Sequence, residues 1–556
     1  MKKDNIKHYA SVVVNMGVFP LIFYFIVFCI LTYPLILRFS THFFAGKRDG
    51  LQNVWNLWWV NKAVTQLHQS PWRTSYLHYP YGISLLGHTL NPFNGFMGIF
   101  LLKSLTLVEA HNFIVVFSFI GGGLTGFWLS YYLTKSYWSS MIAGFIFTFS
   151  NYHFAHAEGH LQLVSLEWIP LFVLCWYVLI TKPGVIVGIA SAIALFAVIL
   201  CDYYYFLYSV LIGCLMVAWY AIQKKDLCFF LRRKHLVPLV VFIAVVLITT
   251  GPLIMSLLLL NMRDPLGGHP SKRYSLDLLA PFIPGGHWRF AHLTQFYWSK
   301  LPGNIHESSV HMGISVLFVL IYVWIRRREF QGQAVWLWYF VLIFFFVMGL
   351  GPVLHIWGRE IPFIRLPYAL FEKVFPPLRI SGLPVRMMVM VMLSASVICG
   401  MGYRMLFQKS AGKRLLAAIL LIMLFIEYLP KPMPSSRVSI PGYVKVLKDL
   451  PDNKGVIDTV ARKQLALYYQ TIHEKPMAFG YVSRTPKSVR EKDSQLRETI
   501  EIKEYIKLCC DYDIRYLITD AATDIASDHL SIEMLYHDSK VKLYYLGTEI
   551  ECPNGR

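Results

Sequence analysis

Long apolar runs alternate with short polar connections through roughly the first three quarters of this 556-residue chain. The first run, from about Val12 to Leu37, exceeds the roughly 20 residues that cross a bilayer as a helix. It is too long for the apolar core of a signal peptide and has no small-residue cleavage site, so we expect an uncleaved span. The pattern predicts a mostly α, polytopic helical membrane protein.

About eleven runs fit the length of a membrane crossing. They cover residues 12–37, 111–133, 138–150, 165–181, 184–201, 203–222, 236–260, 309–325, 333–350, 385–408 and 415–429. The apolar stretch at residues 92–108 is not counted, and we expect it to form a surface or re-entrant helix. Counting it as a span would move the basic connections described next to the outer side of the membrane.

The formal net charge of +20 is explained largely by these connections. Short loops rich in lysine and arginine stay in the cytoplasm. Three such clusters lie between predicted spans: Lys224 to Lys234, Arg326 to Arg328, and Lys409 to Arg414. Because the basic excess follows the topology, it predicts no nucleic-acid partner, and it places the N-terminus inside.

On this topology the polar loops gather on the outer face. They are residues 38–110, 151–162, 201–203, 261–308 and 351–384, and they hold many histidines, acids, glycines and prolines. An active site that opens outward requires such a gathering. Long loops assigned to the outside also collect polar residues by chance. The gathering therefore indicates an outward-facing active site only where particular side chains do so as well.

After residue 429 the hydropathy falls and charged residues become frequent. We therefore divide the chain into a transmembrane domain at 1–429, with a large first external loop at 38–110, and an extracytoplasmic α/β domain at 430–556. Strands are expected at 455–460, 514–519 and 541–546, and helices at 463–472 and 502–510. About 125 residues suffice to bury a separate core.

The nine cysteines do not define a disulfide framework. Several lie in predicted spans, where a thiol behaves as a small apolar group. In the outer domain, Cys552 has two candidate partners, Cys509 and Cys510. The chain contains no C-x-x-C pair and no P-loop.

The first external loop contains the leading catalytic candidate. Asp49 begins an aromatic helix that we expect at the bilayer surface, and Gln52 follows on the same face. Farther along, His88 and Asn91 stand near a helix start, which favours an anion such as phosphate. Asn91 also fits a plain helix cap.

A second candidate site is a dense histidine and carboxylate segment. Its members are His153, His156, Glu158, His160 and Gln162. Such a segment can hold a divalent cation or donate hydrogen bonds to a phosphate leaving group. The spacing matches no established zinc motif, so we rank phosphate binding above metal binding; the alternative is a set of interfacial histidines.

Three further charged residues are candidates. Asp202 lies between two spans, and an acid at that depth is costly to bury and therefore a functional candidate. Arg379 and Arg386 flank a Ser-Gly-Leu-Pro segment on the outer side. Their guanidinium groups suit a lipid phosphate, either that of a substrate or that of a bulk lipid.

Taken together, these segments resemble bacterial membrane glycosyltransferases of the GT-C superfamily. The resemblance rests on Asp49 after the first span, Tyr79-Pro80-Tyr81-Gly82, His88 to Pro92, Phe149 to His153 with Gly159-His160, and Glu167-Trp168-Ile169-Pro170. Many members carry an acidic pair in the first loop, whereas here Lys47 and Arg48 precede a single Asp49.

The resemblance implies transfer of a sugar from a polyprenyl-phosphate donor to a glycan, lipid or protein acceptor at the outer face of the bacterial cytoplasmic membrane. Asp49 would deprotonate the acceptor hydroxyl in an inverting displacement, while basic and histidine side chains stabilise the departing phosphate. No nucleotide or organic cofactor is expected. Two alternatives stay open: a flippase or transporter of lipid-linked saccharides, and a non-catalytic polysaccharide assembly protein.

Overall fold

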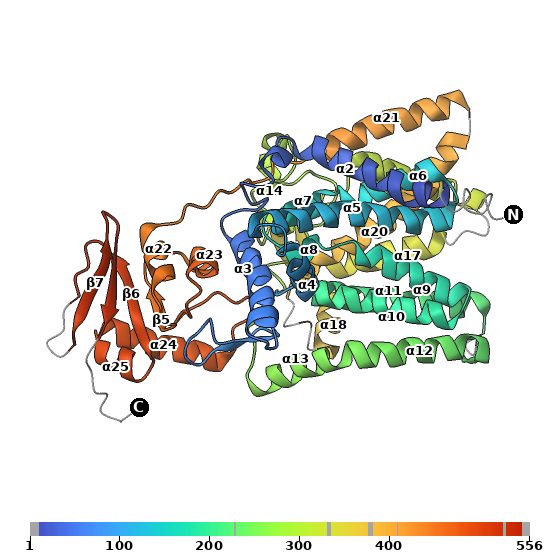
Figure 1. Cartoon of the computed structure of the whole chain (residues 1–556). Coiled ribbons are helices and arrows are strands. Elements are labelled where there is room, and N and C mark those ends of the chain that lie inside the picture. Colours follow the sequence, from blue (N-terminus) through green and yellow to red (C-terminus); the bar gives the residue numbers. More distant parts are fainter. Residues whose placement is uncertain are drawn as a thin grey trace. The chain divides into compact units, whose positions relative to one another are not determined.

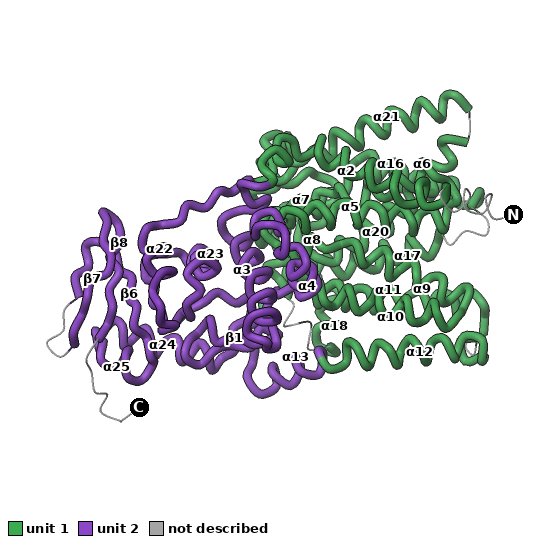
Figure 2. The backbone as a smooth tube through the Cα atoms, viewed as in Figure 1, with its two compact units in different colours: residues 1–39, 112–252, 268–434 green, residues 40–111, 253–267, 435–556 purple. Residues whose placement is uncertain are grey.

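The computed structural model describes residues 11–226, 229–330, 335–375, 378, 382–408, 410–525 and 530–547. The chain forms two compact units, coloured green and purple in Figure 2. Unit 1 comprises residues 1–39, 112–252 and 268–434, and unit 2 comprises 40–111, 253–267 and 435–556. The first external loop therefore belongs to the same unit as the C-terminal segment.

Unit 1 is a helical bundle (Figure 1). Its longer helices are α2 (Phe19–Thr32), α5 (Leu107–Thr134, which starts in unit 2), α6 (Tyr137–Thr148), α9 (Trp168–Thr181), α10 (Val185–Cys201), α11 (Tyr203–Lys224), α12 (Arg233–Thr249), α16 (Ile314–Ile325), α17 (Val335–Gly349), α18 (Pro367–Val374), α20 (Met388–Gln408) and α21 (Ala411–Glu427). Short helical segments are η1 (Val14–Val18), η2 (Leu35–Arg38), α7 (Asn151–Ala157), α8 (Leu161–Val164), η4 (Phe229–Leu231), η5 (Ala291–Thr294), α14 (Gln295–Trp298), α15 (Ile305–Ser308), η6 (Arg327–Phe330) and η7 (Pro384–Met387). Strands β3 (Val353–Ile356) and β4 (Arg359–Arg365) form an antiparallel hairpin.

Helix α20 is the centre of this bundle and packs against α6, α16 and α17. Its sequence carries small residues among methionines and valines, and small residues let helix backbones approach closely in membrane proteins. A Cβ atom on Gly400 would lie 2.4 Å from Ser130 Oγ, and one on Gly402 would lie 2.5 Å from Val319 Cγ1. Both glycines are therefore required by the packing.

The mostly helical multi-pass fold predicted from the sequence is confirmed. Each of the eleven predicted ranges contains a helix. Among the described residues, five helices are long and apolar enough to cross a membrane, and helices α12 and α13 together would make a sixth. The five are Ser11–Thr32, Leu107–Thr134, Leu161–Thr181, Tyr203–Lys224 and Pro384–Gln408.

The stretch at 92–108 forms helix α4 (Pro92–Leu101) in unit 2. A helix of this length extends about 15 Å, half of the hydrocarbon thickness of a bilayer. This length is short for a crossing, and the surface or re-entrant placement of the helix stays a prediction.

Unit 2 combines first-loop and C-terminal elements. From the first loop come α3 (Asp49–Asn61), η3 (Lys62–Gln66), the antiparallel pair β1 (Arg73–Thr74) and β2 (Ile83–Ser84), and α4. The C-terminal segment adds α22 (Gly442–Asp449), β5 (Gly455–Asp458), α23 (Lys463–His473), α24 (Lys487–Glu501), α25 (Tyr505–Cys510), β6 (Ile514–Asp520), β7 (Ile532–His537) and β8 (Val541–Leu546). Most of α13 (Gly251–Arg263) also lies here.

The sheet of unit 2 has the order β5-β6-β8-β7. Strand β5 pairs in parallel with β6, and the other neighbours are antiparallel. The predicted strands at 455–460, 514–519 and 541–546 and the predicted helices at 463–472 and 502–510 all have counterparts. The sequence reading missed α22, α24 and β7.

Polar contacts join the first loop to the C-terminal segment within unit 2. The side chain of Gln470 accepts a hydrogen bond from the Trp55 indole (2.7 Å) and donates one to the carbonyl of Tyr76 (2.6 Å). The backbone of Met477 exchanges hydrogen bonds with Tyr76 (2.9 Å) and Tyr79 (3.0 Å). These bonds fix the register of two segments that lie almost 400 residues apart in the sequence.

The indoles of α3 lie inside unit 2. Trp55 and Trp59 are fully buried and stack on each other with ring centroids 5.8 Å apart, and both belong to a core that includes Leu467 and Met477. The prediction that these indoles lie at the bilayer interface is therefore wrong. Tryptophans at these spacings occur both in the aromatic belt of a membrane protein and in a buried aromatic core. Which of the two forms depends on the segments that pack against the helix, here those of the C-terminal part of the chain.

The cysteine pattern is resolved in part. Cys510 is disulfide-bonded, whereas Cys509 is a buried free thiol. Cys552 lies outside the described residues, so its pairing stays a prediction.

The charge pattern gives a testable topology, with the connection after α16 inside the cell and unit 2 outside. Arg328 and Lys487 are both exposed and offer matched positions for a cysteine. In a variant whose accessible native thiols have been removed, an impermeant maleimide should label Lys487→Cys in intact cells and Arg328→Cys only after lysis. The reverse pattern would overturn the topology.

Candidate active site

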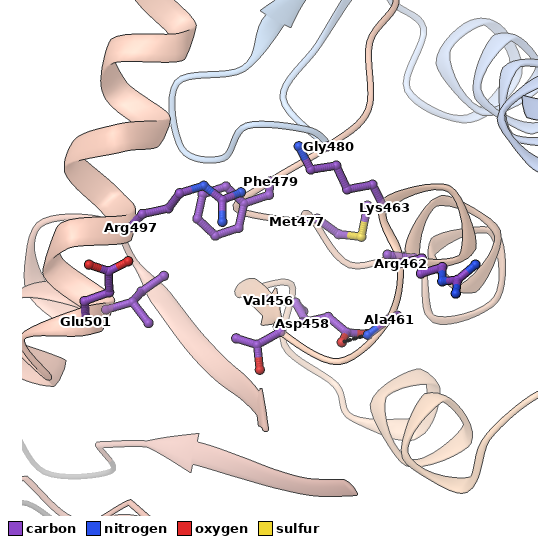
Figure 3. Close-up of a pocket in the computed structure, with 13 residues that line it drawn as sticks. Val456, Asp458, Ala461, Arg462, Lys463, Met477, Phe479, Gly480, Arg497 and Glu501 are labelled. Atoms are coloured by element: carbon purple, nitrogen blue, oxygen red, sulfur yellow. Dashed lines mark hydrogen bonds between the residues drawn. The ribbon is translucent and has the colours of Figure 1, made fainter. Parts of the chain in front are cut away.

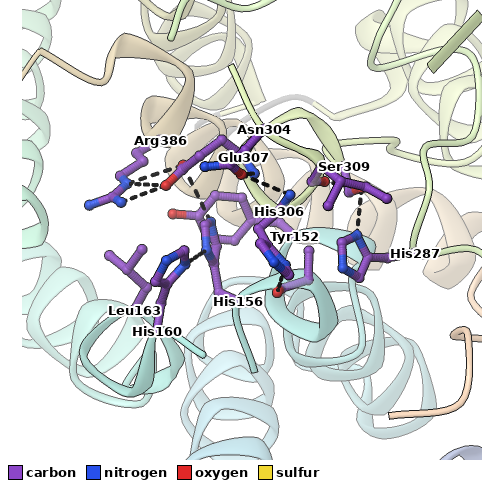
Figure 4. A network of polar contacts seen from close by, with 12 residues as sticks. Tyr152, His156, His160, Leu163, His287, Asn304, His306, Glu307, Ser309 and Arg386 are labelled. Carbon is purple, nitrogen blue, oxygen red and sulfur yellow. Dashed lines mark hydrogen bonds and ion pairs between the residues drawn. The ribbon is translucent and has the colours of Figure 1, made fainter. Parts of the chain in front are cut away.

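Ionisable side chains meet at one place in unit 1, although they come from distant segments (Figure 4). The members are Tyr152, His156, Glu158, His160, His287, His306, Glu307 and Arg386, called here the polar network. The histidine segment supplies four of them through α7 and the turn before α8, and α15 and η7 supply three more. The segment predicted from the sequence is therefore part of a larger cluster.

Arg386 and Glu307 form a buried, bidentate ion pair. Arg386 Nε lies 3.1 Å from both carboxylate oxygens, and Nη2 lies 2.5 Å from Oε1. Burial by itself would raise the pKa of Glu307, but the charge and hydrogen bonds of Arg386 outweigh it and lower that pKa. Nη1 of Arg386 has no hydrogen-bond partner among the described residues, and the guanidinium lies over the Tyr204 ring at 4.8 Å.

His156 stands between this ion pair and His160. Burial, followed by the nearby His160 and Arg386 charges, holds the pKa of His156 well below its usual value, so its ring is neutral. The two Nδ1 atoms are 3.0 Å apart, and His156 Nε2 faces Glu307 Oε2 at 3.8 Å. The 3.8 Å separation is longer than a hydrogen bond, and His156 Nε2 has no hydrogen-bond partner among the described residues.

Glu158, His287 and His306 form a second group beside the first. His287 Nε2 lies 3.4 Å from Glu158 Oε1, and His306 Nδ1 lies 3.8 Å from Glu158 Oε2. Ser309 Oγ is 2.8 Å from His287 Nδ1 and donates to the carbonyl of Ile305 at 2.7 Å. Figure 4 shows the His287–Ser309 contact at the edge of the network.

Two of the other predicted residues of unit 1, His153 and Asp202, have structural partners. His153 places Nδ1 2.6 Å from the Thr148 carbonyl and Nε2 2.9 Å from the Val164 carbonyl, and burial lowers its pKa to about 4. Asp202 caps α11 by accepting the backbone N–H groups of Tyr204 and Tyr205. Gln162 is buried in α8, and its Oε1 has no partner among the described residues. Arg379 lies outside the described residues.

The first-loop candidates all lie in unit 2. Asp49 is the half-buried first residue of α3. Asn91 is the N-cap of α4, accepting the Asn94 N–H at 3.1 Å. Gln52 is buried and donates to Thr89 Oγ1 at 2.9 Å.

His88 has both ring nitrogens occupied. Its Nδ1 accepts the Ser483 N–H at 3.1 Å, and its Nε2 lies 2.9 Å from Asn56 Oδ1, whose amide nitrogen donates to Thr89. This arrangement fits one neutral tautomer, and burial lowers the pKa of His88 to about 3. His88 therefore joins the first loop to residue 483 as an uncharged group.

Unit 2 also contains a pocket of about 340 Å³ (Figure 3). It lies at the carboxyl end of β5 and the start of α23, the edge of a parallel strand pair where α/β folds commonly bind ligands. Arg462, Lys463 and Arg497 face it together with Glu501. Arg497 lies 4.2 Å above the ring of Phe479, which also lines the pocket.

Sequence reasoning missed His287, His306 and Glu307. These residues lie in the long external loop at 261–308. A usable signal was present: Ile305-His306-Glu307-Ser308 places an acid and a histidine directly before a span, as Asp202 is placed.

The chain is similar to solved structures of glycosyltransferases. Arabinofuranosyltransferase AftD from Mycobacteria is 13% identical with a TM-score of 0.57, covering 98% of this chain and 42% of AftD. ArnT from Cupriavidus metallidurans, bound to undecaprenyl phosphate, is 10% identical with a TM-score of 0.49, covering 94% and 97%. The oligosaccharyltransferase AglB from Archaeoglobus fulgidus, in complex with an inhibitory peptide and a dolichol-phosphate, is 12% identical with a TM-score of 0.43, covering 90% and 69%.

The likeness to AftD shows the fold: this chain has the GT-C architecture. It spans less than half the length of AftD. The chain belongs to the family described as Domain of unknown function (DUF6311), whose model matches residues 21–427. No curated protein matches it in sequence.

The buried His88 makes stability depend on pH. An unfolded chain takes up a proton near pH 6.5, whereas the folded imidazole resists it until about pH 3, so its contribution is present above pH 6.5 and is lost as pH falls. At pH 4.5 the loss amounts to about 2–3 kcal/mol. Thermal unfolding at pH 7.5 and 4.5 should therefore show a smaller decrease for His88→Gln than for wild type; equal decreases would contradict the buried neutral state.

Proposed function

We propose that this protein is a membrane glycosyltransferase that moves a sugar from a polyprenyl-phosphate donor to a glycan, lipid or protein acceptor on the extracytoplasmic face. The observation that carries the proposal is the polar network inside a GT-C fold. Ionisable groups buried at the end of a membrane bundle are costly and are functional candidates by default. The GT-C fold supports the class of enzyme, and the polar network supplies ionisable side chains for the transfer reaction.

Arg386 is the group best suited to a phosphate. Its charge is permanent, and its Nη1 edge is not used by Glu307. A departing lipid phosphate needs its developing charge neutralised, and fixed donors in a site with little water do this most effectively. An outward site has no access to cytosolic nucleotide sugars, which favours a lipid-linked donor.

Asp49 is proposed as the base that deprotonates the acceptor in an inverting transfer. It is half-buried and anchored on a helix whose next turns are packed in the core of unit 2. A rigid element holds a catalytic group more accurately than a loose loop does.

The alternatives make different predictions. A flippase or transporter of lipid-linked saccharides would move the donor without consuming it. A non-catalytic assembly protein would bind a glycan through the pocket of unit 2, whose basic lining and Phe479 suit a polar ligand. Sugar transfer by purified protein, followed by mass spectrometry of the acceptor, separates an enzyme from both.

Replacing Asp49 should abolish transfer without unfolding the protein. Asp49→Asn keeps the size of the side chain but cannot accept the proton, so we expect turnover to fall by about 10²-fold or more. Glu109→Gln is the matched control, because Glu109 is also an acid at the start of a helix in the same loop. Near-wild-type turnover of Asp49→Asn would remove this residue from catalysis.

His160 is expected to act on the donor. His160→Ala should raise the KM for polyprenyl-phosphate sugar by about ten- to a hundredfold, since a charge-assisted contact contributes roughly 1.5–3 kcal/mol. The exposed His292 offers the control variant His292→Ala. If only the KM for the acceptor changes, His160 lies on the acceptor side, and the assignment of the donor phosphate is wrong.

A further inference from the structure

The pocket of unit 2 has an apolar floor between two helices of the C-terminal segment (Figure 3). Val456 and Met477 lie in the floor, and their backbones pair in parallel. The N–H of Val456 donates to the Pro476 carbonyl and its carbonyl accepts the Ala478 N–H, both at 2.9 Å, so the floor is held by the sheet. The volume of about 340 Å³ lies within the roughly 300–1,000 Å³ of small-molecule sites.

Three basic side chains line this pocket, and none has an ion-pair partner among the described residues. Arg462 and Lys463 come from the start of α23, and Arg497 comes from α24 on the other side. Glu501 follows Arg497 by one helical turn, a spacing that commonly gives an ion pair. The guanidinium of Arg497 instead lies over the Phe479 ring at 4.2 Å. The pocket therefore presents positive charge that no direct contact neutralises.

The backbone at the start of α23 adds to this positive character. The helix begins at the pocket with no side-chain cap and no acidic residue in its first turn, so the positive end of its dipole is uncompensated there. Asp458, an acid in the lining, is committed to the fold: Oδ1 accepts the N–H groups of Val460 (2.9 Å) and Ala461 (2.8 Å), and Oδ2 accepts the Tyr443 hydroxyl (2.8 Å). These features together favour an anionic ligand.

Glu501 indicates which other groups the ligand carries. Its carboxylate is exposed at the pocket and has no hydrogen bond or ion pair within the described part of the chain. A bare inorganic anion is repelled by a carboxylate, whereas the hydroxyl groups of a sugar can donate to it. The apolar floor of Val456 and Met477 suits the C–H face of a sugar ring. On the predicted topology unit 2 faces the cell exterior, where cytosolic nucleotides are not available.

From these groups we propose that the pocket binds an acidic saccharide, whose anionic group contacts Arg497 and Lys463 while a hydroxyl group donates to Glu501. Arg462 extends the positive side of the pocket at the start of α23. This role goes beyond sugar transfer, because the pocket holds the saccharide without reacting with it. It gives unit 2 a binding function of its own, whichever reaction unit 1 performs.

The test is saccharide binding by the full-length protein in an uncharged detergent, measured by isothermal titration calorimetry. Trigalacturonate and glucose 6-phosphate are the acidic saccharides, maltotriose is the neutral one, and inorganic phosphate is the bare anion. We expect at least one acidic saccharide to bind about tenfold more tightly than both maltotriose and phosphate, because only it uses the cations and Glu501 together. If neither acidic saccharide exceeds both comparisons, the proposal is overturned.

Variants assign the binding to the pocket. Arg497→Ala and Lys463→Ala should each weaken the acidic saccharide about three- to tenfold. The matched control is Arg490→Ala, because Arg490 is an exposed arginine of the same helix outside the pocket lining, and it should bind as wild type does. Glu501→Ala should reduce the preference for the acidic saccharide over phosphate, since it removes both the hydroxyl acceptor and the repulsion.

Lys463→Ala also guards against a misfolded variant. Arg497→Ala removes a side chain that covers Phe479, whereas Lys463 is exposed and has no partner in the described structure, so its loss should leave the Tm unchanged. Wild-type affinity in both variants would show that the saccharide binds elsewhere and would end the proposal. The readout is binding, so the result is independent of whether sugar transfer is observed.

Discussion

The ion pair between Arg386 and Glu307 is the constraint around which the polar network of unit 1 is built. Removing two charges from water costs several kcal/mol each, and only good geometry with further hydrogen bonds offsets this cost. The fork of Arg386 meets both oxygens of Glu307, and the ring of Tyr204 covers the guanidinium. This contact holds α15 to the start of the central helix, and α15 in turn packs against α7.

The same pair divides the histidines into two kinds. Beside Glu307 the carboxylate charge is already compensated by Arg386, and burial keeps His156 neutral, with its Nδ1 3.0 Å from that of His160. Glu158 instead faces two imidazoles, with His287 Nε2 at 3.4 Å and His306 Nδ1 at 3.8 Å. One segment of sequence thus contributes to two groups with different partners, and its spacing matches no single motif.

The elements that depend only on a short stretch of sequence were predicted correctly. The spans follow from hydropathy over about 20 residues, and β5, α23, β6 and β8 follow from short-range periodicity. The features that were missed or predicted wrongly depend on residues that lie far away in the sequence. The indoles of α3 are buried because Gln470 and Leu467 meet them, and Glu307 is paired in the interior only because Arg386 reaches it. Strand β7 was missed because its burial does not alternate in period two.

The structure changes the expected source of positive charge for a phosphate. The sequence suggested the histidines, but burial leaves His88, His153 and His156 uncharged, so each can offer a hydrogen bond and no net charge. A permanent charge is available from Arg386, whose Nη1 edge has no hydrogen-bond partner among the described residues. Arginine remains ionised at all relevant pH values. A phosphate bound at this guanidinium would be neutralised without depending on histidine protonation.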